Sequence, residues 1–234
     1  MGAERGQIGK TGAKASGGDR RIDRWVTVAD DQIYERYQAK AIDEVNALGH
    51  DIAEWLTESH PGAAPVLGTG HPLADIMLVK HRPMPAEVQE GVAFFGRAGQ
   101  AVLKSLQRLR IDPLMLYGTT CMKAAIDPGA DDVEHQCAWL TRELHITQPR
   151  IVVTLGDEAR EFLDSIAFPL AGPCTGAVGE ITRWTPTIET LAVPDIDRCL
   201  DDSASKQAFW DAFKVLGTWY ENLPPYGVLR QKRV

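Results

Sequence analysis

The 234-residue sequence lacks the features that mark membrane, secreted and metal-binding proteins. No apolar run approaches the ~18 residues that a membrane-spanning helix needs, and no apolar signal core lies near the N-terminus. We therefore expect a cytoplasmic protein without membrane contact. None of the four cysteines forms a Cys-x-x-Cys pair, which argues against a disulfide framework or a zinc ribbon and favours reduced, buried thiols. They are Cys121, Cys137, Cys174 and Cys199.

Familiar catalytic and cofactor motifs are also missing. The sequence has no Gly-x-Ser-x-Gly elbow, no His-Glu-x-x-His pair and no Gly-x-Gly-x-x-Gly loop, which argues against a serine hydrolase, a zinc protease and a nicotinamide enzyme. His50, His60 and His71 recur about every ten residues, a spacing that does not support a metal site. We expect neither a metal nor a cofactor.

Positive charge is scarce relative to negative charge. The formal net charge is −7 and the isoelectric point is about 5.4. Because non-specific affinity for DNA comes mainly from Lys and Arg neutralising phosphates, this balance argues against a broad nucleic-acid surface, although not against a local basic patch. The basic clusters lie near the two ends of the sequence: Arg20, Arg21 and Arg24, then Arg230, Lys232 and Arg233.

The first third of the sequence divides into a tail and a helical segment. Residues 1–21 are rich in Gly, Ala and Lys without hydrophobic periodicity, so we expect a disordered tail. From Asp30 apolar residues recur at helical spacing, and Gly49 is a plausible stop before a second helical stretch at residues 52–57. We therefore predict a helical segment over residues 22–65 that packs on a main domain over residues 66–222, and a basic tail over residues 223–234.

The main domain alternates strand and helix patterns. Apolar runs at residues 76–79, 114–117, 151–155 and 191–193 predict strands, and the segments between and after them predict helices. This alternation predicts an α/β fold with three layers, αβα, around a central, mostly parallel four-stranded sheet. Ligands bind beyond the carboxyl ends of such strands, which places a site at residues 80–84, 118–123, 156–158 and 194–198.

Three stretches carry a resemblance to a known family. Residues 74–79 read Ala-Asp-Ile-Met-Leu-Val, residues 94–100 read Phe-Phe-Gly-Arg-Ala-Gly-Gln, and residues 148–156 read Gln-Pro-Arg-Ile-Val-Val-Thr-Leu-Gly. With their spacing, they resemble the uracil-DNA glycosylase superfamily, particularly its bacterial iron–sulfur branch. The resemblance covers roughly residues 66–216 and implies the uracil-DNA glycosylase fold.

The resemblance also implies a function in DNA repair. Members of the family are hydrolases that flip a damaged base, usually uracil, out of DNA and cleave its N-glycosidic bond in base excision. It implies that Phe94 stacks on the base and that Thr120 stands where the family has a base-reading Asn. By position, it implies DNA contacts at Arg97 and Lys123. Thr120 cannot present the bidentate amide edge that reads uracil.

Two loops depart from the family pattern. The loop after the first strand reads Lys80-His81-Arg82-Pro83-Met84, which brings positive charge to the predicted site, so we expect Lys80 and Arg82 to contact DNA. The family's His-Pro loop corresponds to Asp197-Arg198. His81 can act as a general acid or base and Asp197 can orient a water if the two face each other. The alternative is a solvated basic loop beside an acidic turn.

The sequence does not supply the four cysteines of the iron–sulfur branch. Only Cys137 falls at a matching place, and the residue after Lys123 is Ala124. We therefore expect no iron–sulfur cluster.

Three functions remain open on the sequence. The first is a divergent glycosylase that acts on uracil or another damaged base. The second is a catalytically inactive derivative of the fold that binds DNA or a nucleotide, and the third is a protein-interaction scaffold with a partner that the sequence does not name.

Overall fold

The computed structural model describes the backbone of residues 20–223 and the side chains of residues 32–223. The chain divides into two compact units, residues 1–39 and residues 40–234, of which the second contains the sheet. The tails predicted at residues 1–21 and 223–234 lie outside the described residues, apart from their innermost positions. The domain boundaries predicted from the sequence stay predictions.

The first helix, α1 (Arg20–Ser59), runs without interruption through the predicted stop at Gly49. The prediction of two helices was therefore wrong. Gly49 lies in a close contact, since a Cβ at this position would lie 2.9 Å from Cδ1 of Leu67. On both sides of it, Leu48 and Ile52 are buried in a cluster with Trp139 and Ile146 of the helix α4 (Ala130–Thr147). This packing outweighs the ~1 kcal/mol by which a helical glycine is less favourable than alanine.

The sheet has six strands in the order β1-β3-β2-β4-β6-β5. Its four central strands are parallel, which confirms the predicted α/β fold. They are β2 (Ile76–Lys80), β3 (Leu116–Thr120), β4 (Ile151–Leu155) and β6 (Glu189–Val193). Two short antiparallel strands at the edges were not predicted, β1 (Thr69–Gly70) and β5 (Ile181–Arg183).

The apolar runs in the sequence directly predict two of the central strands, β2 and β4. All five residues of β2 and of β4 are buried, as expected for parallel strands that helices cover on both faces. The strand β3 begins later than predicted because the 3₁₀-helix η1 (Pro113–Met115) takes up part of the apolar run. Asp112 caps η1, with its Oδ1 accepting the backbone N–H of Leu114 at 3.0 Å.

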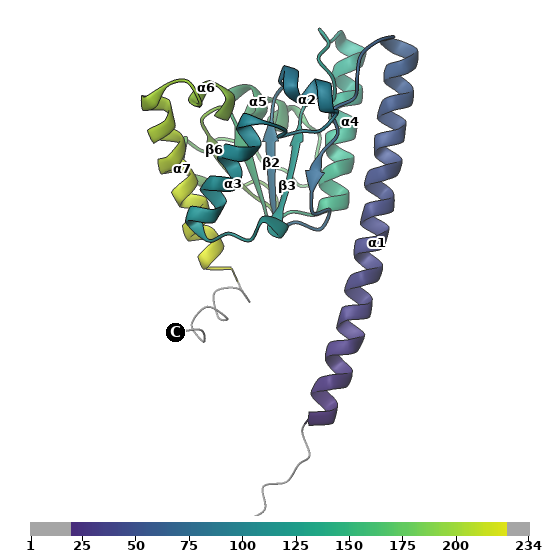
Figure 1. Cartoon of the computed structure of the whole chain (residues 1–234), viewed down its shortest axis with the longest axis vertical. Coiled ribbons are helices and arrows are strands. Elements are labelled where there is room, and N and C mark those ends of the chain that lie inside the picture. The colour runs from purple at the N-terminus through teal and green to yellow at the C-terminus, as the bar shows by residue number, and fades with distance from the viewer. Residues whose placement is uncertain (1–19, 224–234) are drawn as a thin grey trace, which may run out of the picture. The chain divides into compact units, whose positions relative to one another are not determined.

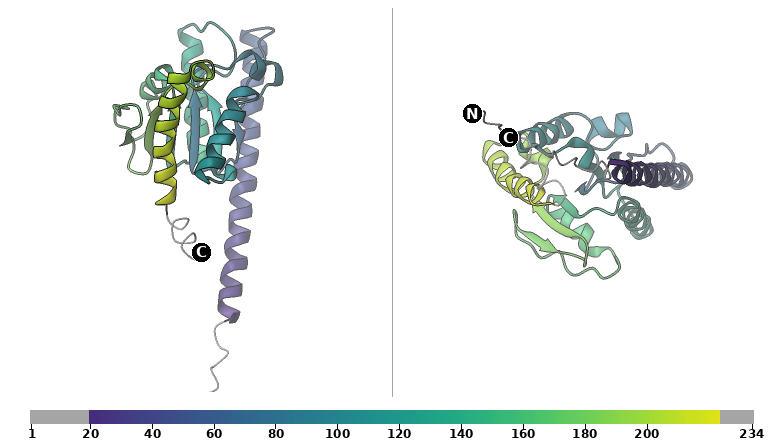
Figure 2. Two further views of the ribbon diagram at one scale, coloured as in Figure 1. Left: turned by 60° about the vertical axis from the view of Figure 1, so that its left-hand side comes forward. Right: turned by 90° about the horizontal axis from the view of Figure 1, so that it is seen from below.

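Helices cover both faces of the sheet. The helices α3 (Arg97–Leu109) and α7 (Ser203–Glu221) pack on one face, and α4 (Ala130–Thr147) and α5 (Asp157–Ser165) pack on the other. Figure 1 shows this arrangement, and the view from below in Figure 2 shows the sheet between α7 and α4. Within residues 20–223, no helix has the length and hydropathy that crossing a membrane requires.

The strand order fixes where a ligand can bind. The connection from β2 leads to β3 on one side, and the chain then crosses to β4 on the other side of β2. Parallel sheets bind ligands beyond the carboxyl ends of their strands at such a switch point. Two short helices that the sequence pattern did not reveal lie in the loops that follow β2 and β6 at this edge, α2 (Pro85–Glu90) and α6 (Ile196–Cys199).

Candidate functional site

The carboxyl edge of the sheet brings together the four segments that the sequence singled out. Lys80 pairs in register with Thr120 on β3 and with Leu155 on β4, and Leu155 pairs with Val193 on β6. The pairing of β2 and β3 continues into the loops, since the backbone N–H of Cys121 donates to the carbonyl of Lys80 at 2.8 Å. The four loops therefore start side by side.

A lysine between two carboxylates forms the centre of this edge. Nζ of Lys80 lies 2.6 Å from Oε2 of Glu87 and 2.7 Å from Oδ2 of Asp197. The side chains of Lys80 and Glu87 are 2% and 1% exposed, whereas that of Asp197 is 17% exposed. A buried ammonium needs such partners, because an unpaired charge in the interior is strongly destabilising. Asp197 is the member of this cluster that solvent or a ligand can reach.

Glu87 holds more than the lysine. Its Oε2 accepts the backbone N–H of Met84 at 2.7 Å, and its Oε1 accepts the backbone N–H of Phe94 at 2.6 Å. The bond to Met84 is one half of a capping box at the start of α2. Glu87 thus joins the loop after β2, the lysine and the loop that carries Phe94.

Phe94 lies against the second strand of the parallel core in an uncommon backbone conformation. Its φ is 60°, in the left-handed region that non-glycine residues seldom adopt. The ring lies over Gly118, where a Cβ would come within 2.7 Å of Cδ2 of Phe94. Nζ of Lys80 is 5.7 Å from the ring centroid, within the range of a cation–π contact. The aromatic face predicted to receive a base is therefore adjacent to the charged cluster.

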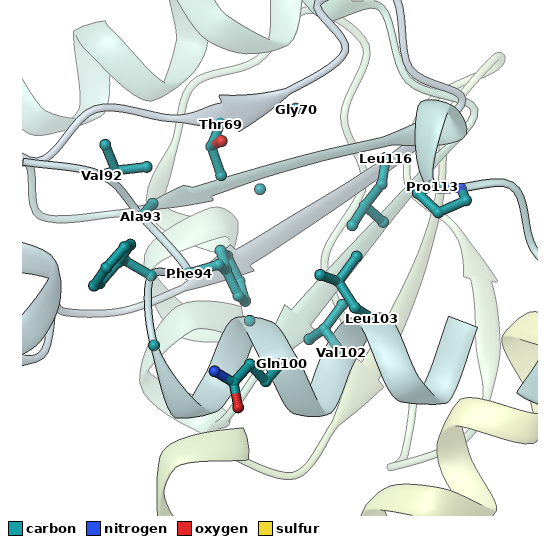
Figure 3. Close-up of a pocket in the computed structure, with 14 residues that line it drawn as sticks. Thr69, Gly70, Val92, Ala93, Phe94, Gln100, Val102, Leu103, Pro113 and Leu116 are labelled. Atoms are coloured by element: carbon teal, nitrogen blue, oxygen red, sulfur yellow. The ribbon is translucent and has the colours of Figure 1, made fainter. Parts of the chain in front are cut away.

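An apolar cavity of about 530 Å³ opens on another side of Phe94, between α3 and the β1–β3 edge of the sheet. Figure 3 shows Phe94, Leu103 and Leu116 around it, with the amide of Gln100 as one of its few polar groups. This volume is in the usual range of small-ligand pockets, and the lining contains no charged residue. Phe94 therefore lines the cavity and contacts the charged cluster as well.

His81 lies at the same edge but does not meet Asp197. No hydrogen bond joins these two side chains in the part of the chain that the structure describes, and Asp197 binds Lys80 instead. The His81 ring packs 6.2 Å from that of Phe162, centroid to centroid. Burial, and then the charge of Arg82, lower the pKa of His81 below its usual 6.5. The condition for a His81–Asp197 pair is therefore not met, and the environment of His81 favours its neutral form.

We expect the imidazole of His81 to titrate with a midpoint below 6.5, because its half-buried ring disfavours the charged form. Folding then favours neutral His81, so its contribution to stability is present above pH 6.5 and is lost as the pH falls through the folded pKa. A histidine-resolved NMR titration measures the midpoint, with His81→Gln to assign the signal. A midpoint at or above 6.5 would contradict the buried environment.

Thr120 and Lys123 do not face a ligand. Both are fully buried, and the Oγ1 of Thr120 has no hydrogen-bond partner among the described residues. Nζ of Lys123 lies 2.6 Å from Oε2 of Glu143, and Oε1 of Glu143 accepts the hydroxyl of Tyr117 at 3.0 Å. Burial and the adjacent carboxylate raise the pKa of Tyr117 well above its usual value. The prediction that Lys123 contacts DNA is therefore wrong. Lys123 instead joins the segment after β3 to α4 in the interior. For the same reason, Lys80, 2% exposed, does not reach a phosphate.

The exposed arginines of this edge are paired with carboxylates. Arg82 lies 3.7 Å from Asp127, and Arg97 lies 2.6 Å from Asp201. Such surface pairs are weak and are screened by salt, so a phosphate can compete for these guanidinium groups. Of the four predicted DNA contacts, Arg82 and Arg97 are the two that solvent reaches.

The sequence reasoning missed two buried acids, Glu87 and Glu143. Glu87 is the third residue of α2, a position where Glu often accepts the backbone N–H of the N-cap residue. This pattern was not recognisable in the sequence, because the N-cap residue is Met84 and not Ser, Thr, Asp or Asn. Glu143 lies on the inner face of α4, where the sequence shows only a charged residue within a helical pattern. The partners of Glu143 lie 20 or more residues away in the sequence, and those of Glu87 lie within seven residues but are brought to it by the fold of the loop after β2, so helical or strand periodicity reveals neither set.

The four thiols do not fit an iron–sulfur cluster. Cys121, Cys137 and Cys174 belong to the core under α4 and α5, whereas Cys199 belongs to the core on the opposite face of the sheet. Because the sheet separates them, they cannot bind one cluster. Burial raises the pKa of Cys121 above its usual range, as expected for an inert thiol.

The fold and the edge site together identify the class of protein. Residues 67–216 match the uracil DNA glycosylase superfamily, and the chain belongs to this superfamily. It is a uracil-DNA glycosylase-like protein, and the resemblance found in the sequence is confirmed.

Two relatives show how far the likeness extends. The chain is 26% identical over 159 residues to the type-4 uracil-DNA glycosylase of Archaeoglobus fulgidus, which covers 65% of this chain and 80% of that protein. It is 30% identical over 105 residues to the type-4 uracil-DNA glycosylase of Sulfurisphaera tokodaii, covering 43% and 48%.

Proposed function

We propose that this protein is a DNA glycosylase that hydrolyses the N-glycosidic bond of a flipped, damaged base. The observation that carries the proposal is the contact of an aromatic ring with a charged cluster at the carboxyl edge: Phe94 lies 5.7 Å from Nζ of Lys80, which holds Asp197 at 2.7 Å. A stacking surface and a solvent-reachable carboxylate are what such a reaction needs beside a base and its sugar.

In this proposal Asp197 is the catalytic residue. Cleavage of a glycosidic bond develops positive charge on the sugar, which a carboxylate stabilises while it also orients the attacking water. The ammonium of Lys80, 2.7 Å from Oδ2 of Asp197, holds this carboxylate in place. Phe94 stacks on the extruded base, and His81, neutral and beside Phe162, accepts or donates a hydrogen bond at the mouth of the site.

The proposed substrate is a damaged base other than uracil. Reading uracil takes a side chain that offers a donor and an acceptor together, and Thr120 is buried and presents neither to a ligand. The acid at position 197 also opposes the negative charge on a departing uracil. We therefore propose a base that is recognised through stacking on Phe94 and through its shape.

A lesion panel tests the proposal. Oligonucleotides that carry uracil, hypoxanthine or an alkylated purine, single-stranded and double-stranded, are incubated with excess protein, and base release is followed by cleavage at the abasic site. Release of at least one base other than uracil, abolished in Asp197→Asn, supports the proposal. No release from any member of the panel excludes it.

The second candidate function is binding without catalysis. It is favoured by one observation, that the lysines predicted to contact DNA are both buried in ion pairs while the exposed Arg82 and Arg97 lie at the rim. A protein with this arrangement can hold a DNA backbone through two arginines and leave its bases intact.

We expect the double substitution Arg82→Ala with Arg97→Ala to weaken DNA binding at low salt. For duplex DNA, each phosphate that is no longer neutralised reduces the slope of log affinity against log salt by about 0.9. Fluorescence anisotropy with a labelled duplex measures both effects. Arg183→Ala is the matched control. Arg183 is also exposed and paired with a carboxylate, 3.0 Å from Glu189, but it is the last residue of β5 and lies beside the amino end of β6, away from the carboxyl edge. Equal binding in the double variant and the control contradicts an arginine rim.

A further inference from the structure

A single buried acid connects the parts of the candidate site. Glu87 is fully buried, and its two carboxylate oxygens receive the ammonium of Lys80 and the backbone N–H groups of Met84 and Phe94. We propose that Glu87 is a positioning residue that fixes the ring of Phe94 beside the Lys80–Asp197 pair. The inference rests on the proposed function, in which Phe94 stacks on the base.

The contacts of Glu87 are too complete for a residue that only balances charge. Lys80 already has Asp197 as a counter-ion at 2.7 Å, so its charge alone does not require a second carboxylate. Burying another carboxylate costs free energy unless its oxygens are satisfied. Here each oxygen accepts a backbone N–H. The two N–H groups, of Met84 and Phe94, lie ten residues apart in the sequence, one just before α2 and one after it.

The backbone of Phe94 needs such a restraint. At a φ of 60°, Phe94 is in the left-handed region, which is unfavourable for a non-glycine residue and persists only when its surroundings hold it. The N–H of Phe94 is held by Oε1 of Glu87 at 2.6 Å, and the ring is held by Gly118 below it. Without Glu87 the N–H loses its acceptor, and the backbone can relax to an ordinary φ that moves the ring off β3.

Glu87 therefore positions two groups of the proposed site, Phe94 and Asp197, without contacting the substrate itself. Through the N–H of Phe94 it sets the stacking face, and through Lys80 it sets the carboxylate of Asp197. A displacement of about 1 Å in such groups lowers turnover by about 100-fold. We expect this loss in kcat for Glu87→Ala, with a smaller change in KM, because the exposed arginines that hold DNA are untouched.

The position of the Phe94 ring can be measured without any activity. The protein is labelled with 4-fluorophenylalanine, and the ¹⁹F resonance of Phe94 is assigned with Phe94→Leu. In Glu87→Ala we expect this resonance to shift while those of Phe162, Phe209 and Phe213 in the cores keep their positions. Glu87→Gln, whose amide oxygen can still accept the N–H of Phe94, shifts it less. The matched control is Glu90→Ala on the exposed side of the same helix, which leaves it unchanged.

An unchanged Phe94 resonance in folded Glu87→Ala overturns the inference. If this variant does not fold, two neutral double variants replace it: Lys80→Met with Glu87→Gln, and Lys80→Met with Glu87→Leu, which differ in the acceptor for Phe94. If the chemical shift of Phe94 is the same in these two double variants, the inference is also overturned. Because these spectra need no substrate, they are independent of the lesion panel, whose failure would exclude the glycosylase proposal alone.

Discussion

Replacing Lys123 with methionine lowers the free energy of unfolding by about 3–5 kcal/mol, the usual result of removing one member of a buried ion pair. The lysine is fully buried, and its ammonium contacts Glu143, Thr119 and the carbonyl of Thr120 within 2.8 Å. Without it, Glu143 stays in the interior without its counter-charge. Urea unfolding followed by tryptophan fluorescence measures the change.

Two further variants separate the ion pair from other effects of the substitution. In Lys123→Met with Glu143→Leu, both charges are absent, and we expect most of the stability to return, since apolar replacements of buried pairs are often neutral. Arg142→Ala is the matched control, because Arg142 is adjacent to Glu143 on α4 but forms an exposed pair with Asp51, worth about 0–1 kcal/mol. A loss in Lys123→Met no larger than in Arg142→Ala would show that Lys123 is not held in the interior.

Changing Asp197 to asparagine reduces the rate of base release by about 100–1,000-fold, the usual effect of removing one electrostatic contact with the transition state. The amide keeps the size of the side chain but lacks the negative charge that stabilises the developing positive charge on the sugar. Folding is preserved because Lys80 keeps Glu87 at 2.6 Å as a counter-ion. Single-turnover assays on the best lesion of the panel measure the rate.

Asp201→Asn provides the control for this loss. Asp201 lies four residues further along, is exposed and pairs with Arg97 at 2.6 Å, so its replacement is expected to change DNA affinity slightly and the single-turnover rate little. Thermal unfolding of both variants shows whether either loses structure. A rate in Asp197→Asn similar to that in Asp201→Asn would remove Asp197 from the proposed mechanism while leaving the wild-type activity established.

Much of the fold was predictable because its signals are local. The apolar run at residues 151–155 became β4 with the same bounds, and residues 157–165 became α5. Short elements were harder. The helices α2 and α6 have six and four residues, too few for a periodic pattern, and the edge strand β1 has two. The helix α1 continued through Gly49 because burial on both sides of the glycine outweighs its weak helical propensity.

The candidate site was predictable in place but not in its pairings. Topology placed the loops after β2 and β6 at one edge, and there Lys80 meets Asp197, 117 residues away in the sequence. The conditional pair of His81 with Asp197 did not form, because adjacent residues of an extended segment point to opposite sides. Lys80, the last residue of β2, points toward Asp197, and His81 packs against Phe162.

The sequence by itself determined the family, the parallel sheet and the edge at which a site lies, since apolar runs, turn residues and the stretch at residues 94–100 are read along the chain. The tertiary structure decided which charged groups are available. It buried Lys80 against Asp197 and Lys123 against Glu143, left Arg82 and Arg97 at the surface, and set Phe94 on Gly118 through Glu87. The physical reason is that the state of a charge depends on burial and on its partners, and both are fixed only when segments far apart in the chain pack together.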